Sequence, residues 1–222
     1  PLAHAPFDQV RRCALRVLVY HDRIAVEFFH SITDGNGGLV FLKTLTAAYV
    51  SLRDGIFIPP EEGVLDWHMP PDPAEWEDSF LKVPGQVSMS RREENAFRIQ
   101  GAREQDGFLH LTVATVSSEA LRTLAKAHGV TITAFLAAVM LQAIMELRPR
   151  RSHRWAKVTI PVDLRRLFES RTLRNFALTV NVGVDPRLGA YSLDELCSVV
   201  QGQLAMQVTP QQMAARAGAN VK

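Results

Sequence analysis

The chain is interrupted by a proline-rich segment that lacks the regular apolar spacing found on both sides of it. Six of the twelve prolines lie within residues 56–105, among charged residues and two tryptophans, Trp67 and Trp76. Prolines at this density exclude a continuous helix or central strand. We interpret the segment as a long linker that crosses the surface and is pinned by its tryptophans, with disorder as the competing interpretation. Residues 1–55 and 106–222 then supply the two lobes of the fold.

The first lobe is predicted to end in a hairpin and a helix. Residues 13–20 and 24–30 are mostly apolar, and the short polar turn between them is typical of a β-hairpin. Apolar residues then recur at helical spacing over 38–52, and Gly55 ends the helix.

The region after the linker alternates between strand and helix patterns. The expected elements are a strand over 108–116, a helix from Ser117 or Ser118 to His128, a helix from Thr131 or Thr133 to Leu147, strands over 155–162 and 177–184, and a helix over 193–208. The helix that ends at Leu147 is strongly apolar, so we expect it to be buried on most sides. This order of elements indicates an α/β fold class, arranged as a layered sandwich.

Composition and charge narrow the classes of function. Hydrophobic residues make up 47% of the chain, and 25 basic against 23 acidic residues give a net charge of +2. That balance offers no electrostatic case for binding nucleic acid or an acidic membrane. No apolar run of about 18 residues predicts a membrane span, and the N-terminus lacks a signal pattern. We expect Cys13 and Cys197 to be buried free thiols, which favours a reducing compartment and a cytoplasmic location.

The most informative motif for function is H-x-x-x-D-G, formed by His30, Asp34 and Gly35 at the end of the second predicted strand. The strand delivers an imidazole to its C-terminal end, where a glycine-rich turn over 35–38 gives the backbone room beside the ring. Histidine titrates near neutral pH, so the motif suits a general base. From spacing alone, a structural histidine and a helix-capping aspartate are the alternative.

The same segment does not fit a metal site or a phosphate loop. In a calcium loop with Gly37 at the turn position, Ile32 and Lys43 would occupy positions that require acidic ligands. His30 and Asp34 span a strand-to-loop junction rather than one helical turn, which argues against zinc. No G-K-[ST] sequence follows the glycines. We therefore expect no bound metal.

Together with three later segments, this motif resembles the sequences of the chloramphenicol-acetyltransferase-like superfamily. Those segments are Pro161–Arg165, Asn175-Phe176 and Val180–Gly183. The superfamily includes CoA-dependent alcohol acyltransferases and peptide-synthetase condensation domains, and the resemblance is closest to the bacterial alcohol-acetyltransferase-like branch. It implies a two-lobed α/β sandwich with a tunnel between the lobes, of which this chain would be an incomplete part.

The resemblance also implies roles for individual residues. His30 would be the catalytic base, and Arg165 would pair with Asp34, so that the loop containing Gly35 presents the imidazole. A surface arginine is the alternative for Arg165. Asn181 is a candidate donor to the oxyanion, with an edge-strand or turn asparagine as the alternative.

The expected function is acyl transfer from CoA or a carrier thioester to an alcohol or amine. Acyl-CoA is the expected co-substrate, and no permanently bound cofactor is expected. Phe29 stands where condensation domains usually carry a first histidine, which favours an acyltransferase over the condensation-type alternative. A catalytically silent scaffold or binding fragment is the non-enzymatic alternative.

Two further expectations concern surfaces. The basic run of Arg148, Arg150, Arg151 and Arg154 is predicted to be a solvated loop, and a grip on CoA phosphates is the weaker alternative. An incomplete fold would leave His30 more open to solvent than a working base should be. It would also expose apolar surface that promotes self-association.

Overall fold

The computed structural model describes residues 13–83, 93–102, 105 and 111–219. Its contacts group into two compact units, and each is described by itself. Among the described residues, unit 1 comprises 93–102, 105, 111–162 and 178–219, and unit 2 comprises 13–83 and 163–177. This grouping differs from the predicted lobes, because residues 163–177 join the unit that contains the hairpin.

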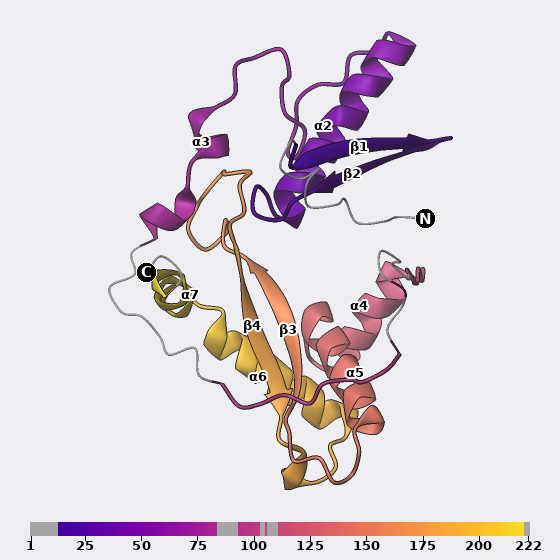
Figure 1. Ribbon diagram of the computed structural model, residues 1–222, viewed down its shortest axis with the longest axis vertical. Helices are drawn as coiled ribbons and strands as arrows, with labels where there is room; N and C mark the ends of the chain where they lie inside the picture. The colour runs from indigo at the N-terminus through magenta and orange to yellow at the C-terminus, as the bar shows by residue number, and fades with distance from the viewer. Residues whose placement is uncertain (1–12, 84–92, 103–104, 106–110, 220–222) are drawn as a thin grey trace. The chain divides into compact units, whose positions relative to one another are not determined.

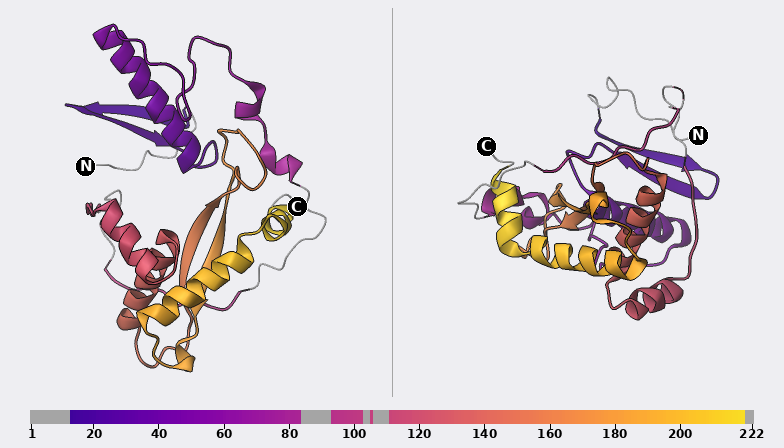
Figure 2. Two further views of the ribbon diagram at one scale, coloured as in Figure 1. Left: turned by 180° about the vertical axis from the view of Figure 1, so that it is seen from behind. Right: turned by 90° about the horizontal axis from the view of Figure 1, so that it is seen from below.

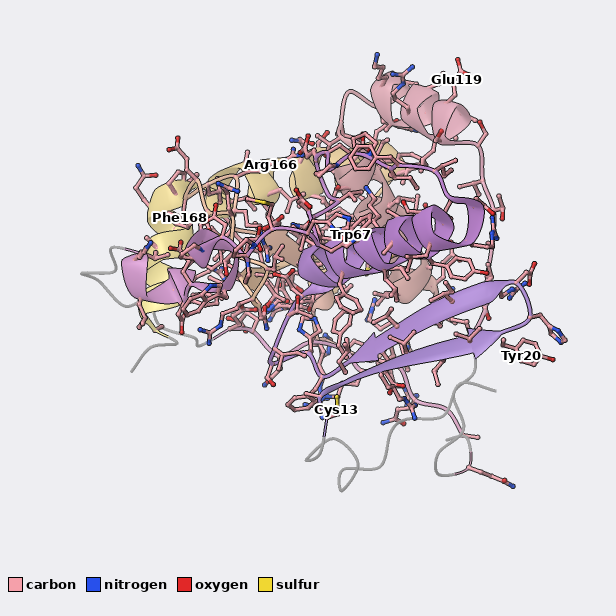
Figure 3. All side chains as sticks on the ribbon, turned by 90° about the horizontal axis from the view of Figure 1, so that it is seen from above. Cys13, Tyr20, Trp67, Glu119, Arg166 and Phe168 are labelled. Atoms are coloured by element: carbon pink, nitrogen blue, oxygen red, sulfur yellow. The ribbon has the colours of Figure 1, made fainter. Side chains whose placement is uncertain are left out.

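Unit 2 begins with the predicted hairpin. β1 (Leu15–Tyr20) and β2 (Arg23–Phe28) pair antiparallel, with Leu15 opposite Phe28. His21 adopts a left-handed conformation in the tight turn, with φ of 50°. Tyr20 stands at the tip of the hairpin (Figure 3) and is 72% exposed, as is Val19. The expected exposed apolar surface is therefore present here, and self-association stays a prediction.

Helix α2 (Gly35–Asp54) follows the hairpin, close to the predicted span. Asp34 caps its N-terminus by accepting the N–H groups of Asn36 and Gly37, and Gly55 closes it with a left-handed φ of 67°. The prediction of a glycine-rich turn over 35–38 is therefore wrong, because these glycines form the first helical turn. The Asp34 cap offsets the low helix propensity of glycine.

The remainder of unit 2 includes much of the predicted linker, which contains two short helices. These are α3 (Pro73–Trp76) and the 3-10 helix η1 (Ser79–Lys82). Trp76 is 63% exposed and does not pin the segment, whereas Trp67 is partly buried. Contacts with α2, such as the N–H of Leu65 donating to the Thr44 hydroxyl at 2.9 Å, and with residues 163–177 also hold it. The N–H of Leu173 donates to the Glu75 carbonyl at 2.6 Å, and the rings of Phe80 and Phe176 meet edge-on, 5.0 Å apart between centroids.

Unit 1 is built on a two-stranded sheet of β3 and β4. Figures 1 and 2 show α6 running along these strands with α5 beside it. Buried side chains from α4, α5, β3, β4 and α6 form one hydrophobic core. The elements are α4 (Ser118–Ala127), α5 (Ile132–Leu147), β3 (Ala156–Asp163), β4 (Ala177–Val184), the 3-10 helix η2 (Pro186–Leu188), α6 (Leu193–Gln207) and α7 (Pro210–Gly218).

The predicted elements of this region are confirmed with one exception. The strand expected over 108–116 is wrong for its described part, because residues 111–116 form no strand, and residues 108–110 lie outside the described residues. Leu111 and Val113 are 66% and 80% exposed. The apolar residues at alternate positions of this segment therefore do not face a hydrophobic core. Helix α7 is an addition, although Thr209-Pro210 is a typical N-terminal pair for a helix.

Helix α5 is buried on one face only, so the prediction of burial on most sides is wrong. Ala134, Ala138 and Leu141 are fully buried, whereas Leu136 and Met140 are 44% and 54% exposed. The inner face packs into the core of unit 1. The outer face is equally apolar, so composition could not reveal which side would be covered.

The two cysteines differ in burial. Cys197 is buried, as predicted, whereas Cys13 is exposed, so the prediction for Cys13 is wrong. Cys13 precedes β1, outside the apolar residues that pair in the hairpin. Burial raises the pKa of the Cys197 thiol.

The described residues form a mixed helix-and-strand fold with two two-stranded sheets. This agrees with the α/β class, and a complete layered sandwich stays a prediction. Across the described ranges, no single helix is long and apolar enough to cross a membrane, and α4 with α5 meets that test only as a pair bent by 80°.

Candidate functional site

His30 lies on the turn that connects β2 to α2 and is exposed, as predicted. The N–H of Phe29 donates to the Ala14 carbonyl at 2.8 Å, and the N–H of Ile32 donates to the Phe29 carbonyl at 3.0 Å. These bonds fix the backbone on both sides of the histidine. A neutral imidazole keeps one nitrogen lone pair, so an exposed ring at this position could accept a proton.

Asn175 is the side chain that holds His30, and no role was predicted for it. Its Nδ2 donates to the His30 carbonyl at 2.9 Å and lies 3.4 Å from the His30 Nδ1. The shorter contact fixes the backbone, while the ring contact is long. The Asn175 Oδ1 is buried without a hydrogen-bond partner among the described residues. In the sequence, Asn175-Phe176 contributes only to the family resemblance, and nothing in local spacing indicates this contact.

Asp34 has two structural tasks in the same loop. Its Oδ1 accepts the N–H groups of Asn36 and Gly37, both at 3.1 Å, and so caps α2. Its Oδ2 accepts the N–H of Phe176 at 2.8 Å, and both oxygens accept from Arg165. The capping role and the ion-pair role, considered above as alternatives, therefore coexist.

Arg165 forms the predicted buried ion pair with Asp34. The guanidinium donates from Nη1 to Oδ2 at 2.9 Å and from Nη2 to Oδ1 at 3.1 Å, in a bidentate arrangement. Its remaining N–H groups bond the carboxylate of Asp163 and the carbonyls of Thr172 and Arg174. The two side chains of the pair are only 8% and 5% exposed. All five donors of the guanidinium are used, so the alternative of a surface arginine is wrong.

The electrostatics of the pair follow from competing effects. Burial alone would raise the pKa of Asp34, but hydrogen bonds from Arg165, Phe176 and Gly37 outweigh it, and the pKa lies below its ordinary value. Burial alone would lower the pKa of Arg165, but the bonds to Asp34 and Asp163 raise it. Both groups therefore stay charged across the neutral range.

Acid should weaken unit 2 through Asp34. A carboxyl with a lowered folded pKa contributes stability above its unfolded pKa of about 3.9, and that contribution is lost as the pH falls through the folded value. We therefore expect the urea concentration at the unfolding midpoint of unit 2 to decrease when the pH is lowered below about 4. Because other carboxyls titrate there too, the measurement is the difference from Asp34→Asn, whose profile should be flatter. Parallel profiles would contradict the prediction.

The glycines of the motif are not equivalent. A Cβ built on Gly37 would lie 2.2 Å from both the Leu173 carbonyl oxygen and the Thr33 hydroxyl, whereas one on Gly35 would meet nothing within 4 Å. The Thr33 hydroxyl already donates to that carbonyl at 2.6 Å. Space therefore requires glycine at Gly37, and Gly35, the residue chosen from the motif, is free of this constraint.

Gly37→Ala should therefore destabilise unit 2 by about 1–3 kcal/mol through overpacking against fixed backbone. Gly35→Ala is the matched control, and its free energy of unfolding should change by less than about 0.5 kcal/mol. Urea unfolding of the two variants measures the difference. Equal stability of the two variants would show that the segment around Leu173 yields without cost.

Asn181 lies on β4 in unit 1. Its Oδ1 accepts the hydroxyl of Thr159 at 2.7 Å, and its Nδ2 donates to Glu93 at 2.8 Å. Glu93 also pairs with Lys157 at 3.2 Å, and hydrogen bonds from Asn181 and Lys157 lower the pKa of Glu93 despite its desolvation. The amide is thus held in a polar network, and the proposed oxyanion role stays a prediction.

Within the described ranges, no group of three histidine, cysteine, aspartate or glutamate side chains is arranged to hold a metal ion.

Comparison with known proteins gives similarity in fold without similarity in sequence. No family model matches the chain, and no curated protein sequence matches it. Polyketide synthase associated protein 5 from Mycobacterium tuberculosis aligns with a TM-score of 0.50 and 18% identity, over 89% of this chain and 53% of that protein. The first condensation domain of the calcium-dependent antibiotic synthetase, in complex with a substrate analogue, aligns with a TM-score of 0.46 and 16% identity, over 85% and 43%. The chain thus spans about half the length of these structures.

Proposed function

We propose that the protein takes part in acyl transfer from a thioester to an alcohol or amine, with His30 as the general base. The observation that carries the proposal is the Asp34–Arg165 pair, which is buried, bidentate and fully hydrogen-bonded. It fixes both the start of α2 and residues 163–177, and Asn175 from that segment holds His30. These hydrogen bonds hold the backbone that carries one exposed imidazole. This arrangement suits proton transfer, because a general base must be held in place to act.

In the proposed reaction, His30 carries the proton from one substrate to the other. His30 accepts the proton of the acceptor O–H or N–H as the oxygen or nitrogen attacks the thioester carbonyl. The tetrahedral intermediate then collapses, the C–S bond breaks, and the thiolate takes the proton back from His30. Asn181 is the predicted stabiliser of the negative oxygen, and Gly35 and Asp34 belong to the loop that presents the base.

The donor is a thioester of CoA or of a carrier protein. Acyl-CoA is the donor expected for the alcohol-acetyltransferase-like branch. A carrier-bound donor is the second candidate, because one structure of similar fold is named a polyketide synthase associated protein. A condensation-type reaction would combine the carrier-bound donor with an amine acceptor, and it would use His30 as the same base. A cytoplasmic location stays a prediction.

The test is an acyl-transfer assay on the protein in the length that the cell makes and, in parallel, on the 222-residue chain. Acetyl-CoA and an acyl carrier protein are offered as donors, with panels of alcohols and amines. Acceptor-dependent release of thiol supports the proposal, and the preferred donor and acceptor decide between the two candidates. Absence of transfer with every combination would favour the silent scaffold.

A further inference from the structure

A cavity of about 360 Å³ lies within unit 1, lined by Asn95, Ala96, Arg98 and Arg154. Its volume falls within the range of about 300–1,000 Å³ that small-molecule sites occupy. None of its lining residues belongs to the site around His30.

Backbone hydrogen bonds order both walls of this cavity. The N–H of Phe97 donates to the Trp155 carbonyl at 2.8 Å, and the N–H of Trp155 donates to the Asn95 carbonyl at 3.2 Å. Ala96 and Trp155 thus form a parallel bridge. The two arginines therefore project from backbone segments that are tied directly together.

Among the described residues, the two guanidiniums in this cavity have no carboxylate partner. Neither Arg98 nor Arg154 forms an ion pair or a side-chain hydrogen bond through its guanidinium with any residue in the described ranges. The neighbouring cation Lys157 is already neutralised by Glu93, at 3.2 Å. Arg187, by contrast, is paired with Asp185. The cavity thus concentrates two uncompensated positive charges.

We propose that this cavity binds a phosphoryl group. The planar fork of arginine matches the oxygens of phosphate in a bidentate manner. A phosphate monoester carries about −1.5 to −2 charges at neutral pH, which two guanidiniums balance. The amide of Asn95 adds a neutral donor or acceptor beside them. A carboxylate would leave one arginine unmatched.

The structure divides the basic run seen in the sequence. Arg154 lines this cavity together with Arg98, which lies far from it in sequence, whereas Arg148 lines a second cavity and donates to the Pro149 carbonyl at 3.3 Å. Arg150 is exposed, as Arg98 and Arg154 are, but it lines neither cavity. Of the arginines in this basic run, Arg154 is therefore the one to which we assign a contact with phosphate.

The source of the phosphoryl group rests on the proposed function. Both candidate donors carry phosphate, on the pantetheine arm and, for CoA, on the nucleotide end as well. Isothermal titration of the 222-residue chain with inorganic pyrophosphate, 4′-phosphopantetheine, pantetheine and 3′,5′-ADP separates these sources without any acyl group or acceptor. The outcome does not depend on turnover, so it can fail or succeed independently of the acyltransferase proposal.

We expect pyrophosphate to bind and pantetheine not to bind. Arg98→Gln and Arg154→Gln should each weaken pyrophosphate binding about ten-fold or more, because each removes charge-assisted hydrogen bonds. Arg150→Gln is the matched control and should keep the affinity of the parent. Amide chemical shifts of residues 95–98 and 154–155 should move on titration, which locates the ligand independently of the variants. Unchanged binding in both cavity variants, or an equal loss in Arg150→Gln, would overturn the proposal.

Discussion

Arg165→Met should lower the free energy of unfolding of unit 2 by about 3–5 kcal/mol, the range typical when one partner of a buried ion pair is removed. The substitution leaves the Asp34 carboxylate buried without its counter-charge. It also leaves the carbonyls of Thr172 and Arg174 without donors. For a domain whose total stability is about 5–15 kcal/mol, such a loss removes a large share of the free energy of unfolding.

The chain supplies a matched control in the same loop. Arg171 pairs with Asp72 at 3.0 Å, but its side chain is 70% exposed, so Arg171→Met should cost less than about 1 kcal/mol. Urea unfolding monitored by hydrogen exchange at the amides of Gly37 and Phe176, which bond Asp34, reports on the pair directly. Equal stability of the two variants would show that the buried pair contributes little.

A double variant separates the charge from the packing. Asp34→Asn keeps an oxygen that can cap α2 but removes the negative charge. In the Arg165→Met background it should restore part of the lost stability, because no unpaired charge then remains buried. Losses that simply add would mean that the two side chains act independently.

The sequence predicted the elements whose signals are local. The hairpin, α2, α4 and α6 each have apolar periodicity together with a turn or a cap, such as the capping box of Ser192 and Glu195 at the start of α6. Helix α5 was placed correctly, but its exposed face could not be anticipated, because burial depends on which neighbours the fold supplies. The contacts of the linker could not be anticipated for the same reason. Glu75 is bonded by Leu173, and residues 93–97 by Trp155, Lys157 and Asn181, all far along the chain.

The candidate site was only partly predictable. The pairing of Asp34 with Arg165 spans 131 positions, and only the family resemblance joined them. Asn175 donates to the backbone carbonyl of His30, 145 positions away in the sequence. Because any residue has such a carbonyl, the residue pattern cannot predict this contact. Gly35 and Gly37 look alike in the motif, and only the proximity of the Leu173 carbonyl distinguishes them.

His30→Ala should lower acyl transfer by roughly 10²–10⁴-fold, the contribution typical of a positioned general base. The loss should appear in kcat, because the imidazole acts on the proton in the transition state and the substitution removes no substrate-binding surface beyond one exposed ring. The fold should persist, since the Asn175 bond to residue 30 uses the backbone carbonyl and survives the change.

The measurement is kcat and KM for the best donor and acceptor pair found in the transfer assay, with thermal unfolding as the check on folding. His21→Ala is the matched control, because His21 is an exposed turn histidine at the opposite end of β2. It should keep the activity of the parent. Added imidazole should restore part of the activity of His30→Ala, because a free base can replace a missing side chain only when proton transfer is what was lost. Full activity in His30→Ala would remove His30 from the reaction and leave its loop with a structural role.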